Sequence, residues 1–414
     1  MKLSEDLVWR GLIKDKTFAD SAWLDKPRKF YLGIDASADS LTIGNLAVIM
    51  LARRLLDAGW QTVMLAGGAT SLVGDPGGKE EERQLQSREA IAKNIDGVKS
   101  QIEKLFAGQP YELVNNLDWL DKLNYLDFLR QFGKFYPVSE LIQREFVDAR
   151  LGEGGSGISY AEFSYSLLQG YDFWWLFKNK GAQMQIGASD QWGNILSGVS
   201  LIRKKEAKEV QAFCMPLVID KKTGRKFGKS EAGAVWLDPA KTSPAQFYQF
   251  WINADDDSVG DFLKIYTLMP KAEIDELMRR QKTAPQDRAA QTALAKAVTK
   301  LVHGDEVVAF AESVTDYITG RQPITEADEP SLKEIRQALP NLAVQPGISL
   351  IEVLVQTGLA ASNSDARRLV QSQAVYANGQ PFNKDHLEAG DFKNGRLMLR
   401  RGKAFKDSAL IELT

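Results

Sequence analysis

The chain has 414 residues, of which 44% are hydrophobic and 26% charged, a composition typical of a globular protein with about two or three domains. No apolar run approaches the roughly 20 residues that span a bilayer, and charged residues occupy the N-terminal segment where a signal peptide is apolar. We therefore expect a cytoplasmic protein with no membrane partner. One cysteine excludes an intramolecular disulfide, and with two histidines the chain lacks the ligands of a structural zinc site.

The charge is distributed unevenly along the chain. The net charge of −2 argues against bulk binding of nucleic acid, but residues 361–414 carry 9 Lys and Arg against 6 Asp and Glu. A basic tail on an acidic body is compatible with local contact to RNA. The two histidines, His303 and His386, both lie late in the chain. If the active site is formed by the first 302 residues, it has no imidazole, and Ser-His and Cys-His catalysis are excluded.

The first third of the chain contains a strand–helix–strand pattern. Residues 29–34 form an apolar run typical of a buried strand, and an apolar-periodic helix follows from about residue 43 to 58. Gly59 ends this helix, and residues 62–66 are the next strand. This spacing predicts a βαβ unit whose parallel strands are joined by a right-handed crossover.

A second such pattern follows a middle section that reads as an insertion. Residues 182–186 are expected to form a strand, 190–204 a helix and 213–219 another strand. The two patterns predict an α/β fold with a doubly wound, parallel, Rossmann-like sheet and a helical insertion, whose ligand crevice lies at the carboxyl ends of the strands. The first strand–helix turn lacks the glycine fingerprint of dinucleotide-binding proteins, which argues against an NAD enzyme.

The remaining chain is expected to be helical first and mixed later. Residues 243–319 have a helical pattern, and four prolines lie within residues 321–347. Two short helices and a strand that enters an Asn378-Gly379 turn are expected in the tail. We predict a Rossmann-like domain at residues 1–230, an α-helical domain at 231–325, a linker at 326–346 and a small α+β domain at 347–414.

A small polar cluster opens the first predicted helix. Thr42 and Asn45 lie three residues apart and share a face of the helix, with Gly44 between them. The free N–H groups and the positive dipole end of a helix N-terminus attract phosphate. For this tetrapeptide alone, an ordinary N-cap is the alternative.

A Gly- and Lys-rich stretch follows the strand expected at residues 213–219. It contains Lys226 and Lys229, and glycines at 224 and 228 permit the movement by which two ammonium groups would close over phosphates. Taken alone, the stretch is equally consistent with a solvated turn. Because both clusters follow parallel strands, together they predict a site for a nucleoside triphosphate.

Two further clusters could bind the rest of a substrate. Asp75 follows the second strand, and its carboxylate suits an ammonium group. Lys79 and Arg83, one helical turn apart, could contact pyrophosphate. The alternative to a binding cluster here is a Gly-Pro surface loop with scattered charges. On a predicted helix within an aromatic stretch, one face carries a phenol, an amide and a carboxylate, which could bind a polar ligand. These three residues are Tyr165, Gln169 and Asp172. The alternative to a binding face is an aromatic core stripe with a polar edge.

With these residues in view, the chain resembles the bacterial tyrosyl-tRNA synthetases, of class I, over essentially its whole length. The tail resembles the S4-type RNA-binding module that ends these enzymes, and the helical domain would lie on the anticodon-arm side. The stretches that carry the resemblance are Tyr31 to Asn45, Gly74 to Pro76, Glu162 to Phe173, Gln185 to Asn194, Lys226 to Ser230, Ser364 to Leu369 and Val375 to Gly379.

The resemblance implies a tyrosine–tRNA ligase that uses ATP to convert L-tyrosine to tyrosyl-adenylate and transfers the tyrosyl group to tRNA(Tyr). It implies that Tyr31 and Asp172 hold the substrate phenol and that Asp75, Tyr165 and Gln169 hold its ammonium group. Gln191 would approach the carboxylate, or the carbonyl after reaction.

The resemblance also implies the ATP-binding residues. Asp190 would take the ribose, with Asp35 nearby, and Ser37 and Thr42 would contact the γ-phosphate, with Gly44 and Asn45 in the same signature. The residues that would stabilise the leaving pyrophosphate are Lys79, Arg83, Lys226 and Lys229.

This chain departs from the family pattern at three places. The first signature of the family reads His-Ile-Gly-His, whereas Thr-Ile-Gly-Asn is the form found in the sister family of tryptophanyl-tRNA synthetases. Leu32 replaces a usual cysteine near the ribose, and Ala188 replaces a usual glycine near the nucleotide.

Three alternatives to a tyrosine–tRNA ligase follow. A tryptophan-specific enzyme is prompted by Thr42 and Asn45, and the tail and the Tyr31–Asp172 pair argue against it. An adenylate-forming paralogue could use another acceptor, and a non-catalytic RNA-binding descendant could have lost ATP chemistry; the retained lysines and arginine argue against the latter.

The chemistry implies Mg²⁺ on the triphosphate, and the resemblance implies a homodimer, for which residues 125–136 are a candidate interface.

Overall fold

A computed structural model describes residues 1–75, 86–143, 145–152, 157–219, 221, 224, 227–230, 233–402 and 407–414. The chain forms two compact units. One contains Met1–Asp238 and Asp255–Ala290, and the other contains Pro239–Ala254 and Gln291–Thr414. Among the described residues, no helix is both long and apolar enough to cross a membrane.

The first unit is built on a six-stranded sheet with the order β1-β6-β5-β2-β3-β4. The chain runs outward from β2 to β4 on one side and from β5 to β6 on the other, so the strand order reverses between β2 and β5. All neighbours are parallel except β1 and β6. The strands are β1 (Asp15–Lys16), β2 (Lys29–Ile34), β3 (Gln61–Ala66), β4 (Tyr111–Asn115), β5 (Met184–Ala188) and β6 (Gln211–Met215). The predicted doubly wound α/β fold is confirmed.

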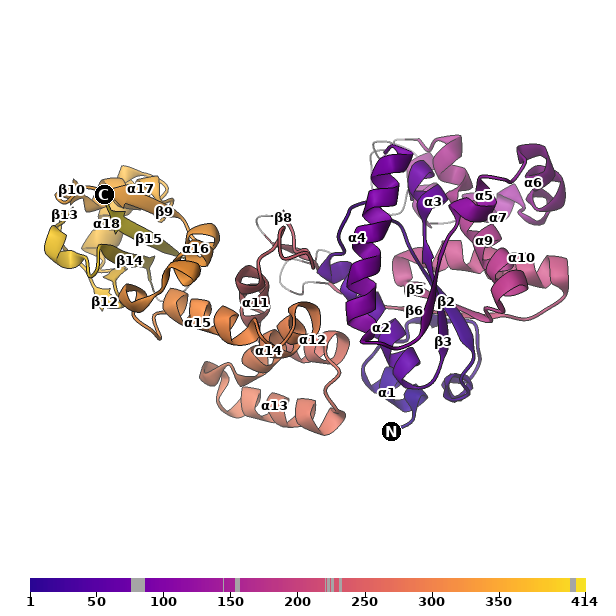
Figure 1. The fold of residues 1–414 in the computed structure, drawn as a ribbon, viewed down its shortest axis with the longest axis horizontal. Coiled ribbons are helices and arrows are strands. Elements are labelled where there is room, and N and C mark those ends of the chain that lie inside the picture. The colour runs from indigo at the N-terminus through magenta and orange to yellow at the C-terminus, as the bar shows by residue number, and fades with distance from the viewer. Residues whose placement is uncertain are drawn as a thin grey trace. The chain divides into compact units, whose positions relative to one another are not determined.

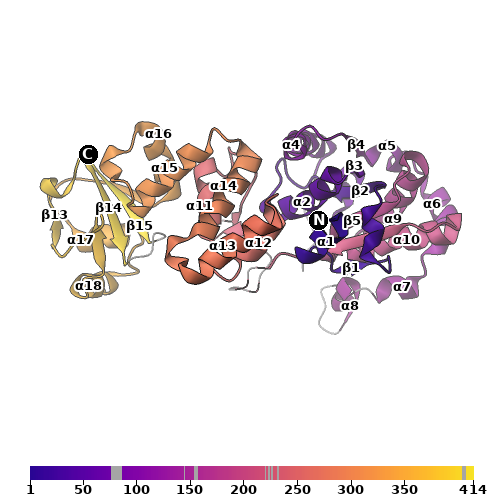
Figure 2. The same ribbon diagram turned by 90° about the horizontal axis from the view of Figure 1, so that it is seen from below.

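Helices cover both faces of this sheet. Figures 1 and 2 show α2 (Ile43–Asp57) and α4 (Arg88–Phe106) on one side, and α9 (Tyr160–Lys180) and α10 (Trp192–Glu206) on the other. The last strand of the sheet is shorter than the predicted 213–219 because Pro216, which has no N–H to donate, follows β6 directly.

The predicted helical insertion is present between β4 and α9. It contributes α5 (Leu117–Leu120), α6 (Tyr125–Gln131), α7 (Val138–Ile142) and α8 (Glu145–Leu151). Aromatic side chains of the insertion pack with those of α9 and β2 in one buried core, which includes Trp119, Phe132, Tyr171, Phe173 and Tyr31. The aromatic stretch of α9 therefore has a structural role as well as a position beside the site.

The helical pattern from residue 243 onward is also observed. It comprises α11 (Pro244–Ile252), α12 (Val259–Tyr266), α13 (Lys271–Thr283), α14 (Ala289–His303) and α15 (Val308–Thr319). However, α12 and α13 belong to the unit of the sheet. Buried Arg54 of α2 explains this placement, since its guanidinium donates to the backbone oxygens of Lys264 and Thr267. The predicted domain boundaries stay predictions.

The end of the chain forms a five-stranded sheet with the order β12-β11-β14-β15-β9, a two-stranded sheet of β10 and β13, and two helices. Asn378 and Gly379, both with positive φ, make the predicted tight turn between β11 and β12. The elements are β9 (Asn341–Val344), β10 (Ile348–Ser349), α17 (Leu350–Gln356), α18 (Asn363–Gln371), β11 (Val375–Ala377), β12 (Gln380–Pro381), β13 (His386–Leu387), β14 (Arg396–Arg401) and β15 (Ser408–Leu413).

Segment 326–346, expected as a linker, contains regular structure. Helix α16 (Glu329–Ala338) lies within it, and β9 is an edge strand of the five-stranded sheet. The prolines do not prevent this, because Pro330 is in the first helical turn and Pro340 precedes the strand, positions that need no proline N–H. The remaining elements are α1 (Leu3–Trp9), η1 (Ser21–Asp25), α3 (Gly68–Val73), η2 (Gly133–Phe135), η3 (Ser189–Gln191), β7 (Lys229–Ser230), β8 (Gly233–Ala234), η4 (Pro285–Asp287), η5 (Ile324–Glu326) and η6 (Ala389–Asp391).

Candidate active site

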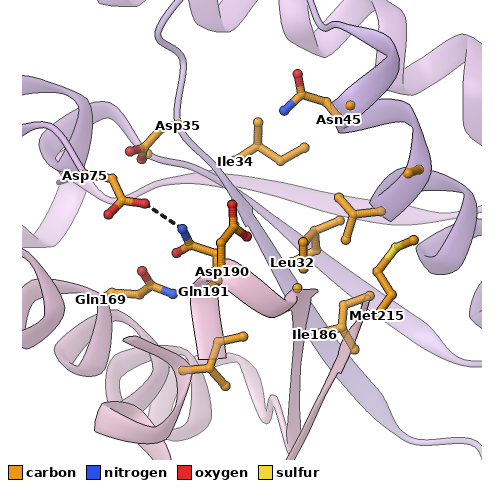
Figure 3. A pocket seen from close by; sticks show the side chains of 18 of the residues that line it. Leu32, Ile34, Asp35, Asn45, Asp75, Gln169, Ile186, Asp190, Gln191 and Met215 are labelled. Carbon is orange, nitrogen blue, oxygen red and sulfur yellow. Dashed lines mark hydrogen bonds between the residues drawn. The ribbon is translucent and has the colours of Figure 1, made fainter. Parts of the chain in front are cut away.

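A pocket of about 300 Å³ lies at the carboxyl ends of β2 and β5, where the strand order reverses. This is the position at which open parallel sheets bind ligands. Twelve of the predicted site residues line it, and Figure 3 shows several of them around one cavity. They are Tyr31, Asp35, Ser37, Thr42, Gly44, Asn45, Asp75, Tyr165, Gln169, Asp172, Asp190 and Gln191.

The side chains of the four cations predicted to contact pyrophosphate are not among those that the structure describes. Lys79, Arg83 and Lys226 fall outside the described residues, and of Lys229 only the backbone is described, as part of β7. Their predicted contact with pyrophosphate stays a prediction.

The first part of the pocket is a buried phenol beside a buried carboxylate. Tyr31 is fully buried, packs on the ring of Phe173 at 5.2 Å, and its Oη forms no hydrogen bond within the described part of the chain. Burial, and then the neighbouring Asp172 carboxylate, raises the pKa of Tyr31 well above its usual value. A buried hydroxyl without a partner is costly, so this end of the pocket favours a ligand that carries a hydroxyl.

Two residues that sequence reasoning missed orient Asp172. The Nδ2 of Asn116 donates to one carboxylate oxygen of Asp172 at 3.0 Å, and the indole Nε1 of Trp119 donates to the other at 2.7 Å. The indole of Trp119 is stacked on that of Trp175 at 4.0 Å. Asn116 directly follows β4, and a polar residue at the carboxyl end of a parallel strand is the signal that could have found it.

The buried position of Asp172 changes the pKa of its carboxyl group. Burial raises the pKa of Asp172 to about 7, although the hydrogen bonds from Asn116 and Trp119 act in the opposite direction. Below pH 7 the carboxyl group of the ligand-free site is therefore mostly protonated, and above pH 7 it is an acceptor for a hydroxyl.

Further acidic groups line the middle of the pocket. The phenol of Tyr165 donates to Asp35 at 2.8 Å, and the Thr70 hydroxyl donates to the other oxygen of Asp35 at 2.7 Å. The Nε2 of Gln191 donates to Asp75, the contact drawn in Figure 3, where Gln169 lies beside Gln191. Carboxylates gathered in a partly buried pocket attract a cationic group such as ammonium.

Thr70, which was not predicted, extends the predicted set beside Asp35. The resemblance implies a position near the nucleotide for Asp35, and in the described structure Asp35 accepts hydrogen bonds from Tyr165 and Thr70 in the acidic middle of the pocket. A Cβ added to Gly67 would lie 2.1 Å from Asp35 Oδ1 and 2.4 Å from Thr70 Oγ1. Glycine at position 67 is therefore required for this arrangement of Asp35 and Thr70.

At the start of α2, Thr42 and Asn45 form a cap that also faces the pocket. The Oδ1 of Asn45 accepts from the backbone N–H of Thr42 at 3.0 Å and from its hydroxyl at 2.9 Å. Figure 3 shows the amide nitrogen of Asn45 on the pocket side. The N-cap interpretation and the ligand-binding interpretation are thus compatible, since the amide oxygen serves the cap and the amide N–H groups are directed to the cavity.

The two predicted triphosphate clusters lie next to each other. The backbone N–H of Ile43 donates to Val235 at 3.1 Å, and that of Leu237 donates to Leu41 at 2.8 Å. At Gly228, with φ of +122°, an added Cβ would lie 3.4 Å from the backbone nitrogen of Gly44. The described end of the lysine stretch therefore lies against the first turn of α2.

Apolar side chains form the remaining wall of the pocket, between β2, β5 and β6. Leu32, Ile34, Ile186 and Met215 gather there in Figure 3, near the carboxylate of Asp190. An apolar wall beside a carboxylate is suited to a base and a ribose hydroxyl of a nucleoside. Leu32 and Ala188, two of the departures from the family pattern, both line this pocket.

Comparisons with known proteins show to which family the chain belongs. Residues 24–318 match the family described as tRNA synthetases class I (W and Y), and residues 331–406 match the tyrosine–tRNA ligase SYY-like C-terminal domain. A tyrosine–tRNA ligase of Lactobacillus johnsonii is 41% identical, over 96% of each chain, and one of Streptomyces avermitilis is 42% identical, over 99% of this chain and 98% of its own. This chain belongs to the tyrosine–tRNA ligase family.

Solved structures place the fold in the same tyrosine–tRNA ligase family. A C-terminally truncated mitochondrial tyrosyl-tRNA synthetase of Aspergillus nidulans has a TM-score of 0.68 and 31% identity, covering 77% of this chain and 94% of its own. A tryptophanyl-tRNA synthetase of Encephalitozoon cuniculi has a TM-score of 0.54 at 15% identity, covering 74% of this chain and 88% of its own, which shows a shared fold only.

The raised pKa of Asp172 predicts a pH dependence for a tyrosine–tRNA ligase. We expect the ionised carboxylate to accept the substrate hydroxyl, so kcat/KM for tyrosine should increase with pH and level off above about pH 7. Below that value, it should change by about tenfold per pH unit. Pyrophosphate exchange at limiting tyrosine from pH 5.5 to 8.5 measures this profile. The same profile for ATP, at saturating tyrosine, is the control, and equal profiles for both substrates would contradict the prediction.

Proposed function

We propose that this chain is a cytoplasmic tyrosine–tRNA ligase, which activates L-tyrosine with ATP and transfers the tyrosyl group to tRNA(Tyr). The observation that carries the proposal is the buried hydroxyl of Tyr31 beside Asp172, which has no hydrogen-bond partner among the described residues and lies in a pocket that also contains the first turn of α2. Family membership supports the same reaction, since the curated relatives are tyrosine–tRNA ligases.

In the first step, the tyrosine carboxylate attacks the α-phosphorus of ATP, and the bond to the β-phosphate oxygen breaks to release pyrophosphate. The carboxylate is already ionised, so no protein base is needed, and the protein contributes positioning and charge stabilisation. Tyr31 and Asp172 would hold the phenol, Asp75, Tyr165 and Gln169 the ammonium group, and the N–H groups at the start of α2 the phosphates.

In the second step, a terminal ribose hydroxyl of the tRNA attacks the carbonyl carbon of tyrosyl-adenylate. The bond between that carbon and the phosphate oxygen breaks, so that AMP leaves and an ester forms. Gln191, which is held between Asp75 and Asn194, would meet the carbonyl or carboxylate group of the substrate. Asp190 would keep the ribose of the nucleotide in place during both steps.

Mg²⁺ would accompany ATP as a ligand of its phosphates. The described residues contain no group of three His, Cys, Asp or Glu side chains that could hold a metal ion. A metal held mainly by phosphate and water oxygens is typical of Mg²⁺ in nucleotide sites. When bound, it would neutralise charge on the triphosphate, and no step above depends on a protein-bound metal.

The tail would bind tRNA through its S4-like domain. Arg367 and Arg368 of α18 are exposed and belong to the stretch that resembles this module. We expect the double variant Arg367→Ala/Arg368→Ala to bind tRNA(Tyr) more weakly, with the slope of log K against log salt reduced by about 2. Filter binding at several salt concentrations measures this slope. Pyrophosphate exchange should be unchanged, and an unchanged salt slope would contradict the role of α18.

We also propose a homodimer, formed through the insertion. Large apolar side chains are exposed on α6, α7 and the start of α9, among them Tyr125 at 57%, Leu126 at 73%, Val138 at 62% and Tyr160 at 62%. Tyr125 and Tyr160 are joined by a hydrogen bond of 3.0 Å, which places the predicted interface segment against α9. Apolar surface of this extent is typical of an interaction site.

Leu126→Asp is expected to convert the dimer to a monomer, because a buried unpaired charge would destabilise the interface. Light scattering over a range of concentrations measures the change, and the tyrosylation rate per subunit should fall with it. The matched control is Leu268→Asp, an exposed leucine at 41% that lies outside the insertion. A wild-type chain that is monomeric and fully active would contradict the proposal.

Exchange of labelled pyrophosphate into ATP, with tyrosine, tryptophan and phenylalanine in parallel, tests the proposed function. Exchange that depends on tyrosine alone is the expected result, and charging of tRNA(Tyr) should follow. Exchange with tyrosine but no charging would favour an adenylate-forming paralogue. No exchange by folded protein with any of the three amino acids would overturn the catalytic proposal.

A further inference from the structure

Helix α4, the long helix labelled in Figure 1, presents a polar face to the loop between β2 and α2. This β2–α2 loop, residues 35–42, contains Asp35 and Ser37 of the pocket and leads directly to the cap formed by Thr42 and Asn45. The loop has no regular secondary structure apart from a single bridge at Thr42, so its position depends on contacts with its neighbours.

Contacts from α4 hold the first half of the loop. The Nδ2 of Asn94 donates to the backbone oxygen of Ala36 at 2.9 Å. A Cβ added to Gly97, one turn further along the helix, would lie 2.1 Å from the backbone oxygen of Asp39. The helix and the loop backbone are therefore in direct contact.

Gln101 holds the second half of the loop with both ends of its amide. Its Oε1 accepts from the backbone N–H of Leu41 at 2.8 Å, and its Nε2 donates to the hydroxyl oxygen of Ser40 at 2.9 Å. Ser40 is buried, with 5% of its surface exposed, and its oxygen also accepts from the backbone N–H of Asp238 at 3.2 Å. One buried hydroxyl thus joins α4, the loop and the segment that follows the lysine stretch.

This arrangement connects the elements that would surround a triphosphate. The loop ends at the first turn of α2, the segment ending at Asp238 continues from the lysine stretch, and α4 follows the segment that contains Lys79 and Arg83. We propose that Gln101 is a positioning residue for ATP, which acts through Ser40 and Leu41 to fix the β2–α2 loop against α4 and so to position the first turn of α2. The inference rests on the proposed function and adds a residue distant in sequence from both signatures.

Gln101→Met tests this inference, because methionine has a similar length and makes neither hydrogen bond. In pyrophosphate exchange, kcat should fall about 10- to 100-fold or KM for ATP should rise correspondingly, since a displacement of about 1 Å near reacting groups costs up to 10²-fold. The dissociation constant of tyrosine, measured by tryptophan fluorescence, should be unchanged, because the tyrosine end of the pocket makes no contact with Gln101. Gln101→Glu should restore most of the activity, since its carboxylate can accept from both Leu41 N–H and the Ser40 hydroxyl.

Two further variants distinguish positioning from general stability. Ser100→Ala, an exposed neighbour on α4, should behave as wild type, and Ser40→Ala should show the same selective defect in ATP use as Gln101→Met. Equal loss of tyrosine binding and of ATP use, or no effect of Gln101→Met and Ser40→Ala on exchange by an active enzyme, would overturn the inference. Absence of exchange in the wild-type chain would overturn the proposed function itself.

Discussion

Asp172→Asn is expected to lower kcat/KM for tyrosine by about 10²- to 10³-fold. Asn116 donates to one oxygen of Asp172 and Trp119 to the other, so an asparagine amide nitrogen must face one of these donors. The variant also loses the charged acceptor for the substrate hydroxyl, and a hydrogen bond to a charged group contributes about 1.5–3 kcal/mol. Steady-state pyrophosphate exchange with varied tyrosine measures the loss.

Tyr31→Phe is the matched variant for this prediction. It should lower kcat/KM for tyrosine by about tenfold and leave the value for phenylalanine unchanged or higher, because a hydroxyl is no longer left unpaired when phenylalanine enters. The folded, ligand-free variant should be at least as stable as wild type, since Tyr31 Oη is buried without a partner among the described residues. Equal losses of kcat/KM for tyrosine and phenylalanine would show that Tyr31 and Asp172 do not recognise the substrate hydroxyl.

Asn45→Asp is expected to lower kcat for tyrosine activation by about 10²- to 10³-fold, with little change in tyrosine binding. The carboxylate would still accept the cap hydrogen bonds from Thr42, but it would replace the amide N–H groups on the pocket side with negative charge. Loss of one donor to developing charge costs about 10²- to 10³-fold, and repulsion of the phosphates adds to it. Single-turnover formation of tyrosyl-adenylate measures this step without tRNA.

Asn45→Ala and Asn45→His complete this series. Alanine removes the donor without adding charge, so its kcat should lie between those of wild type and Asn45→Asp. Histidine, the residue of the more common family signature, restores a donor and should retain more activity than alanine. Wild-type kcat in Asn45→Ala would show that the start of α2 serves only as a cap.

Much of the fold follows from local pattern. The apolar run at residues 29–34, the periodic helix after it and the Asn378-Gly379 turn are short-range signals, and each was found at its predicted place. Signals of this kind are less informative where contacts between distant segments decide the structure. The expected linker folded as α16 and β9, because β9 gains its hydrogen bonds from β15, more than sixty residues further along the chain.

The sequence by itself supplied the candidate groups of the site: a capped helix start, a lysine stretch, and a phenol, an amide and a carboxylate on one face of α9. Only the tertiary structure decided which groups face each other. It brought Asn116 and Trp119 to Asp172, joined Tyr165 and Thr70 through Asp35, and placed Gln101 against Ser40. Residue type and spacing reveal which atoms can donate or accept, whereas hydrogen bonds between distant segments and the pKa shifts caused by burial depend on how the strands and helices pack together.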